Sequence, residues 1–260
     1  MLQKIVFSSR YATRGMIMTQ GIYEIRSNVK IARDVYEMVL SGDTSAITAP
    51  GQFLNIKIEG LYLRRPISIC DWDAETITIL YKVVGEGTEK MTEMTAGGKL
   101  DILVGLGNGF DMSCAGERPL LVGGGVGTPP MYGLCKRLVA MGKKPVVILG
   151  YASAEDVLYE AKFLEMGVEV RIATVDGTRG VKGFVTHAME GLDYTYFYAC
   201  GPIPMLRALS DASATSGELS FEERMGCGFG ACMGCSCKTK YGNKRICRDG
   251  PVLKKEEVIW

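Results

Sequence analysis

The chain has 260 residues, of which 47% are hydrophobic, and this length suits two modest domains with a smaller appendage. Its 30 lysines and arginines balance 29 aspartates and glutamates, so the net charge of +1 excludes the broad basic surface that binds nucleic acids or anionic membranes. No run of about 18 apolar residues occurs, which excludes a membrane-spanning helix.

Residues 1–18 have the composition of a leader segment. They carry Lys4, Arg10 and Arg14, several hydroxyl side chains and no acidic residue, as transit peptides do. Met16 and Met18 are alternative starts, and we prefer to interpret the preceding residues as an over-extended or poorly ordered leader. We expect this segment to carry no chemistry.

Residues 19–114 predict an antiparallel β-barrel. Short segments rich in β-branched and aromatic residues alternate there with turn sequences such as Ala49-Pro50-Gly51. A barrel closes its own edges, and we expect Arg33, Asp34 and Glu37 on its solvated face. The predicted strands cover residues 22–31, 35–40, 52–58, 67–70, 76–83 and 99–104.

Two arginines and a proline interrupt the otherwise apolar strand at residues 63–69. A surface arginine pair is one interpretation of this pattern. Further along, a strand runs into Gly85-Glu86-Gly87-Thr88 and a short helical pattern over residues 88–94. Bare N–H groups and a helix N-terminus at such a turn favour a pyrophosphate, which an arginine facing the turn would neutralise.

Arg65-Pro66-Ile67-Ser68 resembles the flavin-binding motif of the ferredoxin–NADP reductase superfamily, with Ile67 in place of the usual aromatic residue. The resemblance implies that Arg65 meets the phosphates and that Ser68 bonds the isoalloxazine edge. The superfamily's G-P-L-G turn is altered here to Val104-Gly105-Leu106-Gly107. The FAD-binding residues that the resemblance implies are Arg65, Pro66, Ile67, Ser68, Leu80, Tyr81, Lys82, Gly87 and Thr88.

Residues 115–216 predict a doubly wound α/β domain. An apolar strand at residues 119–122 feeds a glycine-rich turn, a helix follows over residues 131–141, and the alternation then repeats. This rhythm predicts an open parallel sheet with helices on both faces. The later strands are expected at residues 145–151, 168–174 and 194–200, and the later helices at 159–166, 184–189 and 205–212.

The glycine-rich turn after the first strand favours dinucleotide phosphates, although it departs from G-x-G-x-x-G and a plain tight turn is the alternative. Cys200-Gly201-Pro202 resembles the C-G-P motif that the same superfamily places beside the nicotinamide, while Cys200 packing in the core is the alternative. The NAD-binding residues predicted are Gly124, Gly125, Gly127, Thr128, Cys200, Gly201 and Pro202.

Two further features bear on this domain. Residues 152–156 are acidic where a 2′-phosphate needs a cation, so NAD is preferred over NADP. His187 is interpreted as structural, because it lacks a neighbouring acid or nucleophile.

Residues 217–260 contain four cysteines with the spacing of plant-type [2Fe–2S] ferredoxins. Cys227, Cys232 and Cys235 give C-x4-C-x2-C, and Cys247 follows after a short loop. Glycines between them let backbone N–H groups turn toward the cluster sulfurs. The sequence therefore predicts these four thiolates as ligands of a [2Fe–2S] cluster.

Zinc and disulfides are the alternatives for these cysteines. Zinc would prefer paired C-x2-C knuckles, and disulfides fit poorly with nine cysteines, an odd number, and no secretory signal. We therefore expect a thiol-reducing cytoplasm as the location. Cys237 is an alternative to Cys235 as ligand, but its spacing matches less well and we interpret it as a buried neighbour.

The segments beside the cysteines carry weaker signals. Glu222, Glu223 and Arg224 are expected on a solvated strand edge rather than against a flavin or a partner. The tail residues Val252, Leu253, Val258, Ile259 and Trp260 are apolar and are expected to dock on another chain.

The predicted cofactors imply electron transfer. Nicotinamide exchanges a hydride, an iron–sulfur centre exchanges single electrons, and a flavin can do both, so the flavin belongs between them. No acid–base pair or activated nucleophile is evident, so no catalytic residue is predicted and a carbon substrate would be oxidised on a second subunit.

Residues 19–260 resemble the electron-transfer subunits of NAD-dependent dihydroorotate dehydrogenases, in R-R-P-I-S, G-G-G-V-G-T-P-P, C-G-P-I-P-M, E-E-R-M-G-C-G-F-G-A-C-M-G-C-S-C and C-R-D-G-P-V. The resemblance implies a heterotetramer, two of each subunit, with an FMN-containing catalytic subunit that oxidises dihydroorotate in pyrimidine biosynthesis. It implies electron flow through [2Fe–2S] and FAD to NAD. The alternatives are a flavin subunit of a ferredoxin–NADP oxidoreductase or sulfide dehydrogenase complex, and a zinc-stabilised binding module.

Overall fold

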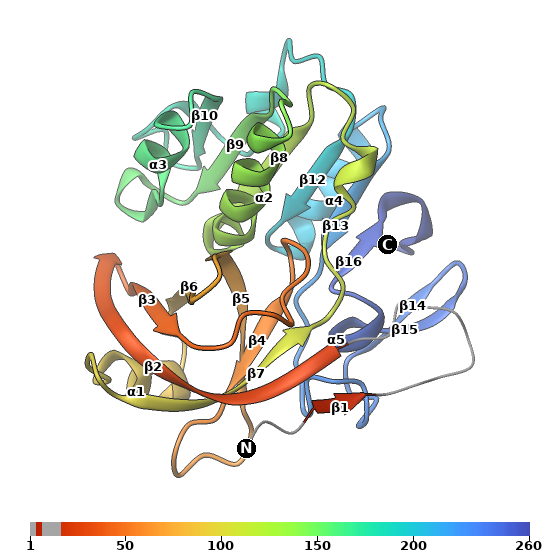
Figure 1. The fold of residues 1–260 in the computed structure, drawn as a ribbon. Coiled ribbons are helices and arrows are strands. Elements are labelled where there is room, and N and C mark those ends of the chain that lie inside the picture. Colours follow the sequence, from red (N-terminus) through yellow and green to blue (C-terminus); the bar gives the residue numbers. More distant parts are fainter. Residues whose placement is uncertain (1–3, 7–16) are drawn as a thin grey trace.

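The computed structural model describes residues 4–6 and 17–260 (Figure 1). Most of the predicted leader, residues 1–18, lies outside these ranges. Its described part includes the short strand β1 (Lys4–Val6), which pairs antiparallel with the start of β2 (Ile17–Ala32). Within the described residues, no helix combines the length and the apolar character needed to cross a membrane.

The first domain is the antiparallel barrel that the sequence predicts. Its strand order is β1-β2-β3-β6-β5-β4-β7, and β2 pairs again with β7 to close the barrel. Alternate residues of each strand point inward, where Ile25, Met38, Leu54 and Ile79 share one core. The remaining strands are β3 (Val35–Ser41), β4 (Phe53–Ile56), β5 (Arg65–Trp72), β6 (Thr76–Lys82) and β7 (Lys99–Leu106).

Helix α1 (Glu86–Thr92) follows β6 and packs Met91 into the barrel core. Asn28 anchors the end of this helix, because its Nδ2 donates hydrogen bonds to the carbonyl oxygens of Met91 (2.8 Å) and Met94 (2.9 Å). The turn before the helix is therefore held at one end of the barrel, beside Arg65.

The second domain is a mostly parallel sheet in the order β11-β10-β9-β8-β12-β13-β16, with β16 antiparallel to β13. Helix α2 (Thr128–Ala140) packs with Leu121 on one face, and α4 (Ile203–Ala212) packs with Val122 on the other (Figure 1). The strands are β8 (Leu120–Gly124), β9 (Val146–Tyr151), β10 (Glu169–Thr174), β11 (Val181–Lys182), β12 (Phe197–Cys200), β13 (Gly217–Ser220) and β16 (Val252–Lys254).

Short elements complete the chain. The cysteine module contains the hairpin β14 (Ser236–Thr239) and β15 (Gly242–Arg245), followed by α5 (Ile246–Asp249). The helix predicted at residues 184–189 forms only the 3-10 turn η4 (His187–Met189). The others are α3 (Glu160–Leu164), η1 (Met112–Cys114), η2 (Gly125–Gly127), η3 (Ala154–Asp156) and η5 (Lys255–Glu257).

The apolar tail was expected to dock on another chain, and for most of its residues this prediction is wrong. Val252 and Leu253 lie on β16, which adds an edge strand to the sheet of the second domain, and Val258 is buried nearby. A short apolar stretch such as Val252-Leu253 suits an internal edge strand as well as an intermolecular one. Ile259 and Trp260 are the tail residues that keep large exposed fractions.

The barrel and the second domain contact each other through charged groups as well as apolar ones. Glu37 was expected on a solvated face, but this half-buried carboxylate accepts hydrogen bonds from Tyr159 and, at 2.7 Å, from Lys162. A Cβ at Gly133 of α2 would lie 2.3 Å from the carbonyl oxygen of Cys70 on β5, so the helix approaches the barrel closely. These contacts hold the barrel and the second domain in a fixed arrangement.

Glu218 of β13 gives the fold a pH dependence. The side chain is 4% exposed, and burial, together with Asp111, raises its pKa to about 7, although the Asp111 N–H donates to its carboxylate. The folded state thus favours the protonated carboxyl of Glu218. Its contribution to the free energy of unfolding is fully present below about pH 4.5 and is lost as the pH rises through about 7. A Glu218→Gln variant is expected to raise the free energy of unfolding by up to about 3 kcal/mol at about pH 8.

The measurement is denaturant unfolding of both proteins at about pH 8 and about pH 5. Glutamine keeps an oxygen that accepts from the Asp111 N–H, so little difference is expected at the lower pH. An equal gain at both pH values would contradict the assignment of the effect to the ionisation of Glu218.

Candidate functional site

A cavity of about 440 Å³ lies between the barrel, the second domain and the cysteine module. Every residue that the sequence assigns to FAD lines it, from β5, β6 and the start of α1. The opposite wall comes from residues far away in the sequence. These are Val126, Ser220, Phe221, Glu222, Glu223, Met225 and Pro251.

Arg65 and Gly87 meet at one end of this cavity. A Cβ at position 87 would lie 2.1 Å from Nε of Arg65, so only glycine lets the guanidinium lie over the turn. Thr88 stabilises the turn, because its Oγ1 accepts from the Val84 N–H (2.9 Å) and donates to the Gly85 carbonyl (3.0 Å). A guanidinium held over a glycine turn fits the phosphates of FAD.

Glu222 and Glu223 follow β13 and are exposed, as expected of them, but they also line the flavin cavity. The signal in the sequence was their place after a strand, because ligands gather at the carboxyl edge of a doubly wound sheet. The thiol of Cys200 lies nearby, with Ser220 as its hydrogen-bond partner, and burial raises its pKa.

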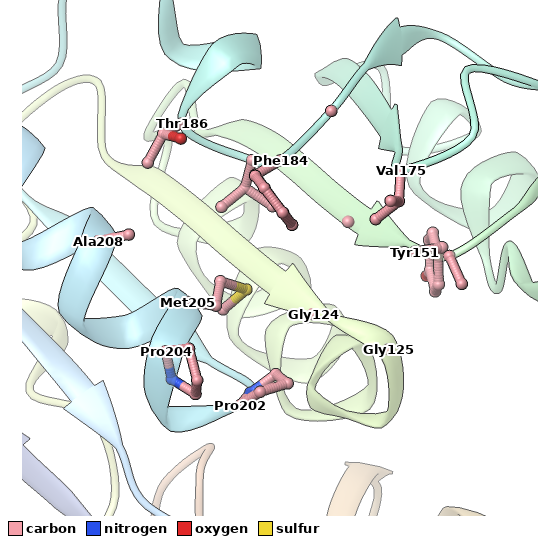
Figure 2. Close-up of a pocket in the computed structure, with 14 residues that line it drawn as sticks. Gly124, Gly125, Tyr151, Val175, Phe184, Thr186, Pro202, Pro204, Met205 and Ala208 are labelled. Carbon is pink, nitrogen blue, oxygen red and sulfur yellow. The ribbon is translucent and has the colours of Figure 1, made fainter.

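A second cavity, of about 480 Å³, lies at the carboxyl ends of β8, β9 and β10 (Figure 2). Gly124, Gly125 and Pro202, which the sequence assigns to NAD, line it. Figure 2 shows Met205 and Pro204 of α4 on one side and Phe184 with Val175 on the other. Its position at the carboxyl edge of a parallel sheet is the usual place for a dinucleotide.

The other residues predicted to bind NAD lie behind this cavity. A Cβ at Gly127 would lie 2.1 Å from the Cys200 carbonyl oxygen, and Gly201 packs against Gly124. Thr128 is fully buried, and its hydroxyl shares a hydrogen bond of 2.8 Å with Tyr151. In this structure these residues shape the turn, and their contact with NAD stays a prediction.

The turn between β8 and α2 borders both cavities. Gly124 and Gly125 line the second cavity, whereas the next residue, Val126, lines the flavin cavity. The two cavities therefore adjoin each other at this turn. Adjoining sites suit hydride exchange between a nicotinamide and a flavin.

The four cysteines predicted as cluster ligands form two pairs. Sγ of Cys227 accepts from the N–H of Cys232 (3.4 Å) and contacts the Cys232 thiol, and Sγ of Cys235 accepts from the N–H of Cys247 (3.4 Å). In the part of the chain that the structure describes, no three metal-binding side chains are grouped around a single ion position. Two thiol pairs fit a [2Fe–2S] cluster, because each of its irons takes two of the four thiolates.

Backbone N–H groups surround Cys227. Burial alone would raise its pKa, but the N–H groups of Cys232 and Phe229, the Cys232 thiol and the Ala231 N–H bring the pKa down to about 7. The backbone of this loop thus favours the thiolate form of Cys227 even without a bound metal. Cys237 lies apart on β14, opposite Lys244, and burial raises its pKa.

Two protein families match the chain. Residues 121–211 match the family described as the oxidoreductase NAD-binding domain, and residues 222–259 match the iron-sulfur cluster binding domain of dihydroorotate dehydrogenase B. The solved structure of an NADH-dependent reduced ferredoxin-NADP oxidoreductase is similar, with a TM-score of 0.83 and 28% identity over 92% of this chain and 90% of that one. Phthalate dioxygenase reductase has the same fold at a TM-score of 0.61 and 21% identity, over 78% of this chain and 67% of that one.

The fold and the three sites define a reductase that binds a flavin and a nicotinamide and carries its own iron–sulfur module. A relative from Bacillus mycoides (strain KBAB4) is 45% identical over 246 residues, which cover 88% of this chain and 95% of that protein. A relative from Bacillus cereus (strain B4264) matches to the same extent. The chain belongs to the family of dihydroorotate dehydrogenase B (NAD(+)) electron transfer subunits, which confirms the resemblance seen in its motifs.

Proposed function

We propose that this chain is the electron transfer subunit of an NAD-dependent dihydroorotate dehydrogenase in cytoplasmic pyrimidine biosynthesis. It would connect NAD, through FAD and a [2Fe–2S] cluster, with a catalytic subunit that contains FMN and oxidises dihydroorotate. We expect two copies of each subunit in the complex. The family membership supports this function, and the observation that carries it is the placement of three sites side by side in one chain.

The residues assigned to the three sites would bind and orient, and oxidation of the carbon substrate is assigned to the partner subunit. The groups they would hold supply hydride exchange at the nicotinamide and flavin, and one-electron exchange at the cluster. Arg65 and the Gly87 turn would hold the flavin phosphates, and Gly124 and Gly125 would let a dinucleotide approach the turn beside Val126. Cys227, Cys232, Cys235 and Cys247 would bind the irons.

Purified protein, co-expressed with a candidate FMN subunit, tests this function. The expected result is a coloured complex that contains flavin, iron and labile sulfide and that reduces NAD when dihydroorotate is added. A colourless protein would favour the zinc-stabilised binding module instead. A coloured protein that exchanges electrons between ferredoxin and NADP, without dihydroorotate oxidation, would favour the ferredoxin–NADP oxidoreductase alternative, for which the similar solved structure is the argument.

The preference for NAD has a structural argument of its own. None of the described residues that line the second cavity is charged, so a 2′-phosphate would find no cation there. The acidic run of residues 152–156 contributes only Ala152 to this cavity, and Asp156 instead pairs with Arg33 at 2.9 Å. The absence of a cation among these lining residues, rather than repulsion by Asp156, supports NAD.

An Ala152→Arg variant is expected to raise the catalytic efficiency with NADPH about tenfold, because a guanidinium at the cavity wall can pair with the 2′-phosphate. The measurement is flavin reduction by NADH and NADPH in parallel, with Ala152→Gln as the uncharged control of similar length. Equal NADPH use by both variants would contradict a role for charge at this position.

A further inference from the structure

Two barrel asparagines contact the two ends of the cysteine module. The first, Asn55 of β4, is 1% exposed, and its Nδ2 donates a hydrogen bond of 3.3 Å to the carbonyl oxygen of Cys227. Gly228 follows with φ +80°, and a Cβ there would lie 2.4 Å from Nδ2 of Asn55. Glycine thus lets the loop that begins with the first cysteine lie directly on the barrel.

The second asparagine, Asn108, follows β7 and binds the segment after the last cysteine. Its Oδ1 accepts from the Val252 N–H (2.9 Å), and its Nδ2 donates to the Val252 carbonyl (2.8 Å). The backbone N–H of Asn108 also donates to the Gly250 carbonyl (2.6 Å). At Gly107, where φ is +69°, a Cβ would lie 2.6 Å from Cδ of Pro251. The altered turn Val104-Gly105-Leu106-Gly107 therefore leads into a clamp on this segment.

The second clamped segment lines the flavin cavity, and the first is held by a strand that also lines it. Pro251 lines the cavity, and so does Phe53, which precedes Asn55 by two residues and therefore lies on the same face of β4. The Phe221 N–H donates to the Pro251 carbonyl (2.9 Å), so this segment is also held from the side of the second domain. A shift at either point would change the distance between the cysteine pairs and the flavin cavity.

Stability alone does not account for Asn55. Its Oδ1 is buried and has no hydrogen-bond partner among the described residues, an arrangement that destabilises a fold, whereas an apolar residue of the same shape would not. The hydrogen bond to Cys227 is therefore the feature of the Asn55 amide that an apolar side chain could not replace. Asn108 makes a two-way contact with backbone that a side chain of another shape cannot reproduce.

We propose that Asn55 and Asn108 are positioning residues that hold the first and last cysteine ligands at a fixed distance from the flavin. This inference rests on the proposed function, because it assumes a flavin in the cavity and a cluster on the cysteines. Groups that exchange electrons must be held rigidly by the residues around them. Asn55 and Asn108 would hold the cysteine module in this way from the barrel.

The test compares wild type, Asn55→Leu, Asn108→Ala and the double variant, each as holoprotein co-expressed with the FMN subunit. We expect wild-type flavin, iron and sulfide contents and a wild-type rate of flavin reduction by NADH. Amide hydrogen exchange should become about tenfold faster at residues 226–235 in Asn55→Leu and at residues 250–254 in Asn108→Ala. Cluster reduction after NADH addition, followed by its absorbance and by electron paramagnetic resonance, should slow in the single variants and slow further in the double variant.

Two matched controls accompany these variants. Thr19→Val removes another buried polar atom without a partner among the described residues, inside the same barrel, and should leave exchange and cluster reduction unchanged. Asn108→Asp keeps the acceptor for the Val252 N–H but places a second oxygen against the Val252 carbonyl, so it should speed exchange and slow cluster reduction as Asn108→Ala does. Wild-type exchange and wild-type cluster reduction in the double variant, with all cofactors present, would overturn the inference alone. A wild-type protein without flavin or iron would overturn the proposed function, and this inference with it.

Discussion

A Cys232→Ser variant is expected to lose dihydroorotate-dependent NAD reduction to background, while the FMN subunit still reduces its own flavin and NADH still reduces FAD. Cys232 pairs with Cys227, and a serine hydroxyl is a poor ligand for iron in a sulfur-rich cluster. The two ends of the electron path would then remain active but unconnected. The measurements are coupled turnover, iron content and flavin reduction with each electron donor separately.

Cys237→Ser is the matched control, because Cys237 is the neighbouring cysteine that stands outside the two pairs. This variant should keep its iron and its coupled turnover. Loss of the cluster in Cys237→Ser, together with its retention in Cys232→Ser, would reject the ligand assignment.

A Gly87→Ala variant is expected to bind FAD about a hundredfold more weakly, because the added methyl group would occupy the place of the Arg65 guanidinium. Displacement of this side chain removes a charge-assisted contact to the phosphates. The measurement is titration of the deflavinated protein with FAD, followed by flavin fluorescence. The [2Fe–2S] content should stay unchanged, since Gly87 lies on the barrel and not on the cysteine module.

Glu89→Ala controls for changes elsewhere on α1, since Glu89 is exposed on the same helix and does not line the flavin cavity. It should bind FAD with nearly wild-type affinity. Equal loss of affinity in both variants would point to the helix as a whole and not to the contact between Arg65 and position 87.

Most of the architecture could be predicted because its signals are local. Alternating apolar residues and turn sequences identified the barrel strands, and the strand–helix rhythm identified the second domain. The helix expected at residues 184–189 failed for a local reason as well. Gly183 and Gly191, both with positive φ, confine the segment, and the Phe184 N–H is taken up by Nδ1 of His187 (3.0 Å). Too few residues remain for a stable helix.

The sequence predicted one wall of the flavin cavity but not the other. The cysteines stand in a compact motif whose spacing indicates a cluster, and Arg65 and Gly87 stand in motifs whose resemblance to a known family indicates a flavin. Val126 and Pro251 reach the flavin cavity through tertiary contacts between distant segments, which no local pattern reports.

The tail illustrates the same limit. Its apolar residues are equally compatible with a strand that pairs within the chain and with one that pairs between chains. Only the position of β13 beside it decides between the two.

The pairing of β16 with β13 means that the iron–sulfur part is not a detachable cassette. Its last strand belongs to the sheet that forms the nucleotide cavity, so a truncation after Cys247 would remove the edge of another domain as well as the closing stretch of its own. To graft this module onto a different reductase, one would have to transfer β13 as well, or build a sheet edge that pairs with β16.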